Sequence, residues 1–102
     1  KKVADSRPKV TETFFPNGTK VTETFFPNGN LRDKISYKSK IDGGKKDGLS
    51  ESYYDNGQLE YKGNFKDGEE EGLWEFDFED GEWSFTDCYN NGEVVDMSYC
   101  EK

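Results

Sequence analysis

Apolar and polar residues alternate along much of the chain, in short runs that end at glycines. Trp74, Phe76 and Phe78 alternate with acidic residues, and Leu59 and Tyr61 begin a similar run. A period of two residues places these side chains on one face of a β-strand. The glycines mostly follow Asn or Asp, a pair typical of tight hairpin turns. The pattern predicts an all-β protein, built as an antiparallel meander of β-hairpin repeats in an elongated, largely single-layer sheet.

The spacing of the turn glycines indicates a repeat. From Gly57 onward they follow at intervals of 11, 13 and 11 residues, so that one full unit contains 24 residues. A single hairpin of this kind has too little apolar surface to be stable alone, and successive units should stack into one continuous layer. We therefore expect one repeat domain over residues 9–102, preceded by a flexible N-terminal tail at residues 1–8.

One strand-and-turn segment occurs twice in the sequence. The letters KVTETFFPNG stand at residues 9–18 and again at residues 20–29. Such identity indicates a recent tandem duplication or an engineered one, and inserting a half-unit should preserve the alternation of inward and outward side chains. Either copy could fill the strand position beside residues 30–41. Three arrangements are open: both copies lie in the sheet, one copy is displaced, or a copy is exchanged with a second molecule.

Composition and charge narrow the range of partners. Hydrophobic residues make up 30% of the chain and aromatic residues 16%, so the apolar layer is mainly Phe, Tyr and Trp. The net charge of -8 is unevenly divided, because residues 1–46 carry +6 and residues 47–102 carry -14. The acidic half argues against nucleic acid or anionic lipid as the main partner, since both need a basic surface. The sequence has no transmembrane stretch, so we expect no membrane insertion. The opposite charges also permit attraction between the two ends of the chain, within one molecule or head-to-tail between molecules.

The sequence offers no catalytic constellation. It contains no histidine and two cysteines, Cys88 and Cys100, which excludes a Ser/His or Cys/His pair and the usual four-ligand zinc site. Carboxylates such as those of residues 69–71 lie at predicted turns and should be solvated. A second acidic group could offer oxygen ligands to calcium but lacks the spacing of an EF-hand: Asp77, Glu79, Asp80, Glu82 and Asp87. We expect no enzyme activity, no metal and no cofactor. Cys88 and Cys100 are either two free thiols or a disulfide, which would slightly favour export to the periplasm or cell surface over the cytoplasm.

An ordered series of aromatic, glycine and Asn/Asp positions runs through YYDNGQLEYKGNFKDGEEEGLWEFDFEDG, residues 53–81. This stretch resembles the bacterial MORN-repeat variant, the repeat of the YwqK-type antitoxin family, and looser similarity extends over residues 25–96. The resemblance implies a non-enzymatic, protein-binding scaffold, with an antitoxin-like role as one form. The alternative is an exported structural or envelope-associated repeat protein that self-associates through edge strands, including strand exchange through the duplicated segment.

The aromatic rows have two interpretations. They either stack on one another along the repeat, or they form an exposed strip that contacts another protein. An acidic rim around such a strip would favour a basic partner. The candidate binding residues are Tyr53, Tyr54, Trp74, Phe76, Phe78, Trp83 and Phe85.

Overall fold

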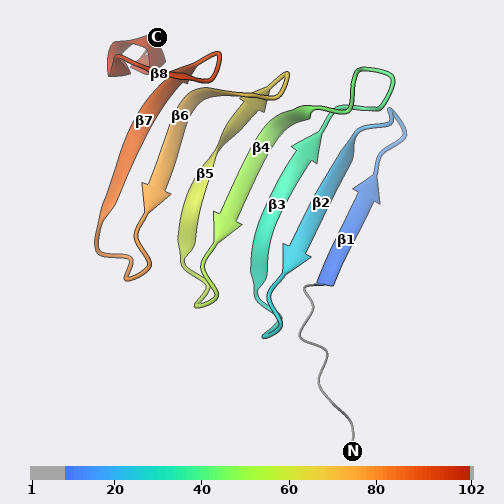
Figure 1. Cartoon of the computed structure of the whole chain (residues 1–102), viewed down its shortest axis with the longest axis horizontal. Coiled ribbons are helices and arrows are strands. Elements are labelled where there is room, and N and C mark those ends of the chain that lie inside the picture. The colour runs from blue at the N-terminus through green and yellow to red at the C-terminus, as the bar shows by residue number, and fades with distance from the viewer. Residues whose placement is uncertain (1–8, 102) are drawn as a thin grey trace, which may run out of the picture.

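The computed structural model describes residues 9–101, so the expected tail at residues 1–8 lies outside the described residues. The predicted all-β meander is confirmed: eight strands form one antiparallel sheet, and each strand pairs with its neighbours in the sequence (Figure 1). The elements are β1 (Lys9–Phe14), β2 (Lys20–Phe25), β3 (Leu31–Tyr37), β4 (Lys46–Tyr53), β5 (Leu59–Lys66), β6 (Glu69–Asp77), β7 (Ser84–Asn90), β8 (Glu93–Val95) and the short 3-10 helix η1 (Met97–Glu101).

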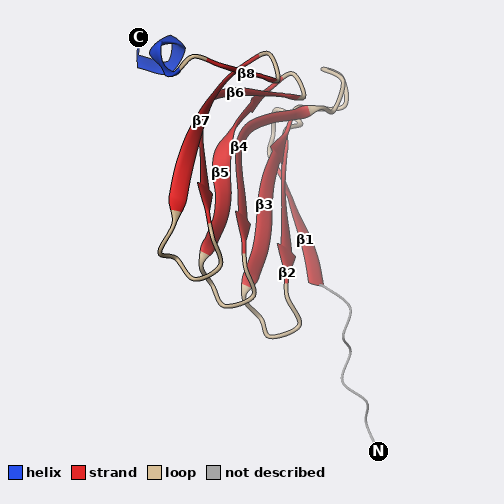
Figure 2. Cartoon of the chain, turned by 60° about the vertical axis from the view of Figure 1, so that its left-hand side comes forward, coloured by secondary structure: helices blue, strands red, loops and turns tan. Residues whose placement is uncertain are grey.

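The sheet is a single curved layer. Its principal extents are 58 × 41 × 17 Å, and the turned view in Figure 2 shows the curvature of the strands. The turns that join β2 to β3, β4 to β5 and β6 to β7 lie together at one end of the strands, and we call them the lower turns (Figure 1). The remaining connections lie at the opposite end and are called the upper turns.

Strand register separates the side chains into two faces. Tyr61 pairs with Phe76, and Phe76 pairs with Phe85, so these rings lie in one row across three strands. Residues two apart on a strand share a face. We call this side of the sheet the aromatic face, and the other side, which carries Leu73 and Cys88, the opposite face. The rings of the aromatic face are those of Tyr61, Phe65, Trp74, Phe76, Phe85 and Tyr89.

The core of the sheet is centred on Trp74. This side chain is 3% exposed and lies directly over Gly63 in the neighbouring strand, where a Cβ would be 2.1 Å from Trp74 Cδ2. The Phe65 ring meets the indole edge-on, with ring centroids 5.0 Å apart. The Trp74 Nε1–H donates to the Asn64 carbonyl oxygen at 3.1 Å. A glycine is therefore needed here so that the indole can lie flat on the backbone.

Hydrogen bonds between turns join successive repeats. Among the lower turns, Asn28 Nδ2 donates to the Asp55 carbonyl at 2.9 Å, and Asn56 Nδ2 donates to the Glu79 carbonyl at 3.1 Å. Among the upper turns, the Gly68 N–H donates to the Lys46 carbonyl at 2.8 Å, and the corresponding N–H of Gly92 donates to a residue of β6. Each unit is thereby fixed to the next at both ends of its strands.

Both copies of the duplicated segment lie in the sheet, as β1 and β2. They pair antiparallel, with Phe14 opposite Lys20 and Lys9 opposite Phe25. The expectation that the insertion preserves inward and outward alternation is wrong for the copied residues themselves. Because 11 is an odd number, a residue and its copy point to opposite sides of the sheet. Phe14 lies on the aromatic face, where Lys20 Nζ stands 5.9 Å from its ring centroid, whereas its copy Phe25 lies on the opposite face.

The two edges of the sheet differ. At one edge, β8 has three residues and is followed by η1, which a disulfide between Cys88 and Cys100 ties to β7, with Cα atoms 6.0 Å apart. Cys88 is fully buried, and the Tyr99 hydroxyl donates to Glu71 Oε2 at 2.6 Å. At the other edge, β1 has six residues, and no described residue forms a strand beyond it.

Candidate functional site

The structure divides the seven candidate aromatic residues into three groups. Trp74 belongs to the core and offers almost no free surface. Its indole packs β6 against β5 through the contacts with Gly63 and Phe65 described above. Tyr61, Phe65 and Tyr89 complete the same aromatic layer and were not among the candidates, although the alternation around Gly63 could have identified the first two.

Tyr53 and Tyr54 use their hydroxyl groups within the fold. The Tyr53 hydroxyl donates to Glu51 Oε2 at 2.7 Å on the opposite face, and this hydrogen bond, with some burial, raises the pKa of Tyr53 to about 12. The Tyr54 hydroxyl donates to the Asp77 carbonyl at 2.9 Å, and burial raises the pKa of Tyr54 above its ordinary value. Tyr53 therefore lies apart from the exposed aromatic residues, whereas Tyr54 reaches the backbone of Asp77, between Phe76 and Phe78.

The remaining candidates gather at the lower end of β6 and β7. Trp83 is 69% exposed, Phe78 50% and Phe85 48%. The Phe78 N–H donates to the Trp83 carbonyl at 2.9 Å, which continues the register in which Phe76 faces Phe85. The Phe76 and Phe85 rings are stacked with centroids 5.0 Å apart, and Phe78 lies 6.3 Å from Phe85. We call Phe76, Phe78, Trp83 and Phe85 the β6–β7 patch.

Three exposed carboxylates border this patch in the connecting turn: Glu79, Asp80 and Glu82. The turn is ordered by its own hydrogen bonds, since Asp80 Oδ1 accepts from the Glu82 N–H at 2.9 Å and the Gly81 N–H donates to the Phe78 carbonyl at 2.8 Å. The Glu79 carbonyl also accepts the bond from the preceding lower turn. Negative charge is thus held beside exposed aromatic carbon, an arrangement that suits a partner with basic groups.

A shallow hollow continues the aromatic face above the β6–β7 patch. It has a volume of about 240 Å³ and is lined by Tyr61, Phe65, Glu70, Trp74, Phe76 and Tyr89. Lys46 Nζ stands 5.1 Å from the Phe65 ring centroid at its margin. The aromatic face therefore already receives an ammonium group of the chain itself, through a cation–π contact.

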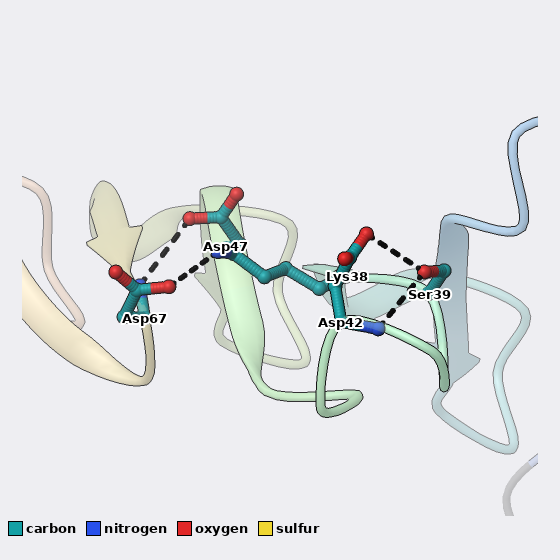
Figure 3. A network of polar contacts seen from close by, with 5 residues as sticks. All are labelled: Lys38, Ser39, Asp42, Asp47 and Asp67. Carbon is teal, nitrogen blue, oxygen red and sulfur yellow. Dashed lines mark hydrogen bonds and ion pairs between the residues drawn. The ribbon is translucent and has the colours of Figure 1, made fainter.

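The polar cluster of the upper turns connects parts of the fold (Figure 3). Lys38 extends to the carboxylate of Asp67, and this pair raises the pKa of Lys38 and lowers that of Asp67, chiefly through their hydrogen bond. Asp47 Oδ1 accepts from the Asp67 N–H at 3.3 Å, and Ser39 Oγ donates to Asp42 Oδ2 at 3.0 Å. These contacts hold the turn after β3 against the turn after β5. The carboxylates of Asp42, Asp47 and Asp67 are thus bonded to other groups of the chain.

Metal and membrane sites can be assessed within residues 9–101. In that range no three His, Cys, Asp or Glu side chains are grouped so that they could hold a metal ion. No helix in the same range is long and apolar enough to cross a membrane.

Comparison with known protein families gives one match. The model of the MORN repeat variant matches residues 19–39 and 46–67, which correspond to the β2–β3 and β4–β5 hairpins. Two stretches of the chain are therefore similar to the MORN repeat variant, a repeat that commonly mediates protein interactions. No curated protein and no solved structure matches the chain. Neither the first copy of the duplicated segment nor the β6–β7 patch lies within the matched residues.

Proposed function

We propose that this chain is a non-enzymatic, protein-binding scaffold whose contact surface is the β6–β7 patch. The observation that supports the proposal is the exposure of Phe78, Trp83 and Phe85 together on one hairpin. Large aromatic side chains left in water are unfavourable unless another surface covers them, and Trp is enriched among the residues that dominate binding energy.

The chemistry of the partner follows from the charges around the patch. Residues 47–102 carry a net charge of -14, and Glu79, Asp80 and Glu82 place part of it at the border of the exposed rings. A basic protein surface would be steered to this end of the sheet and would have its cationic side chains beside both carboxylates and aromatic faces. Neutralising a small basic toxin, as the resemblance to the antitoxin family implies, is one form of this function.

The test combines capture from the native host with variants of exposed residues. Trp83→Ser removes the most exposed ring of the patch, and Leu73→Ser is its matched control, because Leu73 is 50% exposed on the opposite face. We expect a single stoichiometric partner that is retained by Leu73→Ser and lost with Trp83→Ser, with binding that weakens as salt is added. Capture that is unaffected by Trp83→Ser, with Phe78→Ser and Phe85→Ser equally without effect, would contradict the proposal.

A second candidate function is structural: an exported repeat protein that self-associates through its edge strands. The specific observation that favours it is the outer edge of β1, which no strand of residues 9–101 covers. The disulfide between Cys88 and Cys100 is compatible with export to an oxidising compartment. Thiol labelling of the protein isolated from its host under denaturing conditions tests the export. Full labelling of both cysteines would contradict it.

A further inference from the structure

We propose that β1 pairs edge to edge with β1 of a second copy of this chain, around a two-fold axis at Thr11. The result is one continuous sheet through both molecules. The proposal rests on the second candidate function, for which it names the surface, the partner and the register. It is independent of the β6–β7 patch, because β1 and that patch lie at opposite ends of the sheet (Figure 1).

The outer edge of β1 is able to accept another strand. The Phe15 N–H donates to the Thr19 carbonyl, so alternate residues from there, Thr13, Thr11 and Lys9, face β2 with their backbone groups. The backbone N–H and C=O groups of Val10, Glu12 and Phe14 therefore point away from the sheet. The pairing of β1 with β2 has no bulge, and β1 contains no proline, so it lacks two of the devices that commonly protect an edge strand.

The duplicated sequence shows how this edge behaves when it is covered. In β2 the equivalents of the outward-pointing residues are Val21, Glu23 and Phe25, and the backbone groups of these residues bond to β1. The same six letters are exposed at five positions in β1 and half-buried at all six positions in β2. The sequence KVTETF therefore pairs along both edges when it forms β2. When it forms β1, no strand of residues 9–101 pairs with its outer edge.

The C-terminal edge does not offer a comparable strand. β8 has three residues, and the chain turns away from it into η1, which the Cys88–Cys100 disulfide holds against the end of the sheet. The outer side of β7 is uncovered only over residues 84–87, because β8 pairs with the rest of that strand. A head-to-tail array would join β1 to this short stretch. The longest free edge within residues 9–101 is that of β1, and its best match is the same edge of another copy.

Symmetry and charge determine the register. A two-fold antiparallel pair requires one residue to stand opposite itself, so the candidates are Val10, Thr11, Glu12 and Thr13. An axis at Glu12 places like charges directly opposite, an axis at Val10 runs into the residues before β1, and an axis at Thr13 runs into the turn. An axis at Thr11 places Val10 opposite Glu12 and Lys9 opposite Thr13, with no like charges paired. It also pairs outward-pointing backbone groups with each other, on both sides of the axis.

The first experiment removes one outward-pointing N–H. Glu12→Pro deletes a donor that β2 does not use, whereas Glu12→Ala removes the same side chain and keeps the N–H. We expect light scattering and sedimentation to show a dimer for the unchanged chain and for Glu12→Ala, and a folded monomer for Glu12→Pro. A monomeric unchanged chain at submillimolar concentration, or a dimer of Glu12→Pro, would overturn the proposal.

The second experiment tests the register. Residues at the axis form a non-hydrogen-bonded pair, whose Cα atoms lie about 4.5 Å apart, within the range that a disulfide spans. Thr11→Cys should therefore crosslink two molecules on mild oxidation, and Thr13→Cys, which would face Lys9, should not. Crosslinking of both variants to the same extent would refute the register. Capture of a partner by Glu12→Pro should be unchanged, so a failure of this proposal is distinguishable from a failure of the β6–β7 patch.

Discussion

Replacing Gly63 by alanine tests the packing on which the whole sheet depends. Gly63 lies inside β5 without a positive φ, so alanine introduces no backbone strain there. Its Cβ, however, would stand 2.1 Å from Trp74 Cδ2, well inside the 3.4–4 Å of an ordinary contact. The indole would have to withdraw by more than an ångström, away from Phe65 and from the Asn64 carbonyl.

The magnitude follows from three opposing contributions. Overpacking of this kind costs roughly 1–3 kcal/mol, and loss of the Trp74 hydrogen bond costs about 1 kcal/mol. Restricting the unfolded chain by a Gly-to-Ala change returns roughly 0.4–1 kcal/mol. We expect a net loss of about 2 kcal/mol in the free energy of unfolding, because the clash outweighs the entropic gain. For a domain of this size such a loss lowers Tm by roughly 8–16 °C.

Urea unfolding, followed by circular dichroism, measures this change directly. Asn64→Ala is the control, since the neighbouring Asn64 side chain is exposed and its loss should change the free energy of unfolding by less than about 0.5 kcal/mol. In a Trp74→Leu background the effect of Gly63→Ala should shrink, because the flexible leucine can move aside. A loss below about 0.5 kcal/mol in the unchanged background would refute the packing argument.

Three further predictions follow from the edges and the tyrosines. Cys100→Ser should release η1 and lower stability by about 2–3 kcal/mol, seen as a lower Tm and faster hydrogen exchange around Cys88; an unchanged Tm would contradict this. In an absorbance titration Tyr53 should ionise with a pKa of about 12, and Glu51→Gln should return this pKa toward the ordinary value. Because its folded pKa lies above the unfolded value of 10.0, the stabilisation is complete below pH 10 and disappears as pH rises toward about 12. Deleting residues 9–19 should cost no more than about 1 kcal/mol, since β1 is mostly exposed, and a larger loss in urea unfolding would show that β1 supports the core.

Much of the fold could be predicted from local patterns. Alternation of period two and the Asn-Gly and Asp-Gly turns specify strands joined by hairpins, and hairpins in an unbroken series make a meander. The same alternation assigns residues to faces but does not show which of them are covered. Trp74 and Phe85 both lie on the aromatic face, and the position of Gly63 beneath the indole makes the first a core residue, whereas the second stays in water.

Irregular pairing accounts for another part of what the sequence missed. The register between β4 and β5 shifts at Ser52 and Tyr53. At this end of β4 the side chains of Tyr53 and Tyr54 take different directions. One then bonds to Glu51 and the other reaches the end of β6. Neither the shift nor the partner can be read from an aromatic pair in the sequence, because both depend on the strand that lies beside it.

The odd length of the duplicated segment also limits how such an array can grow. Copying a full unit of 24 residues returns every side chain to the face it came from, and the aromatic layer would continue without interruption. Copying 11 residues instead fills the place of an odd-numbered strand with the sequence of an even-numbered one, and Val10, Glu12 and Phe14 stand where β5 has Tyr61, Gly63 and Phe65. A further strand added beside β1 would find Glu12 in place of a glycine, so an indole could not lie flat on the backbone of β1 as Trp74 does on Gly63. A half-unit copy of this kind therefore ends the extension of the aromatic core in that direction, while backbone pairing could continue.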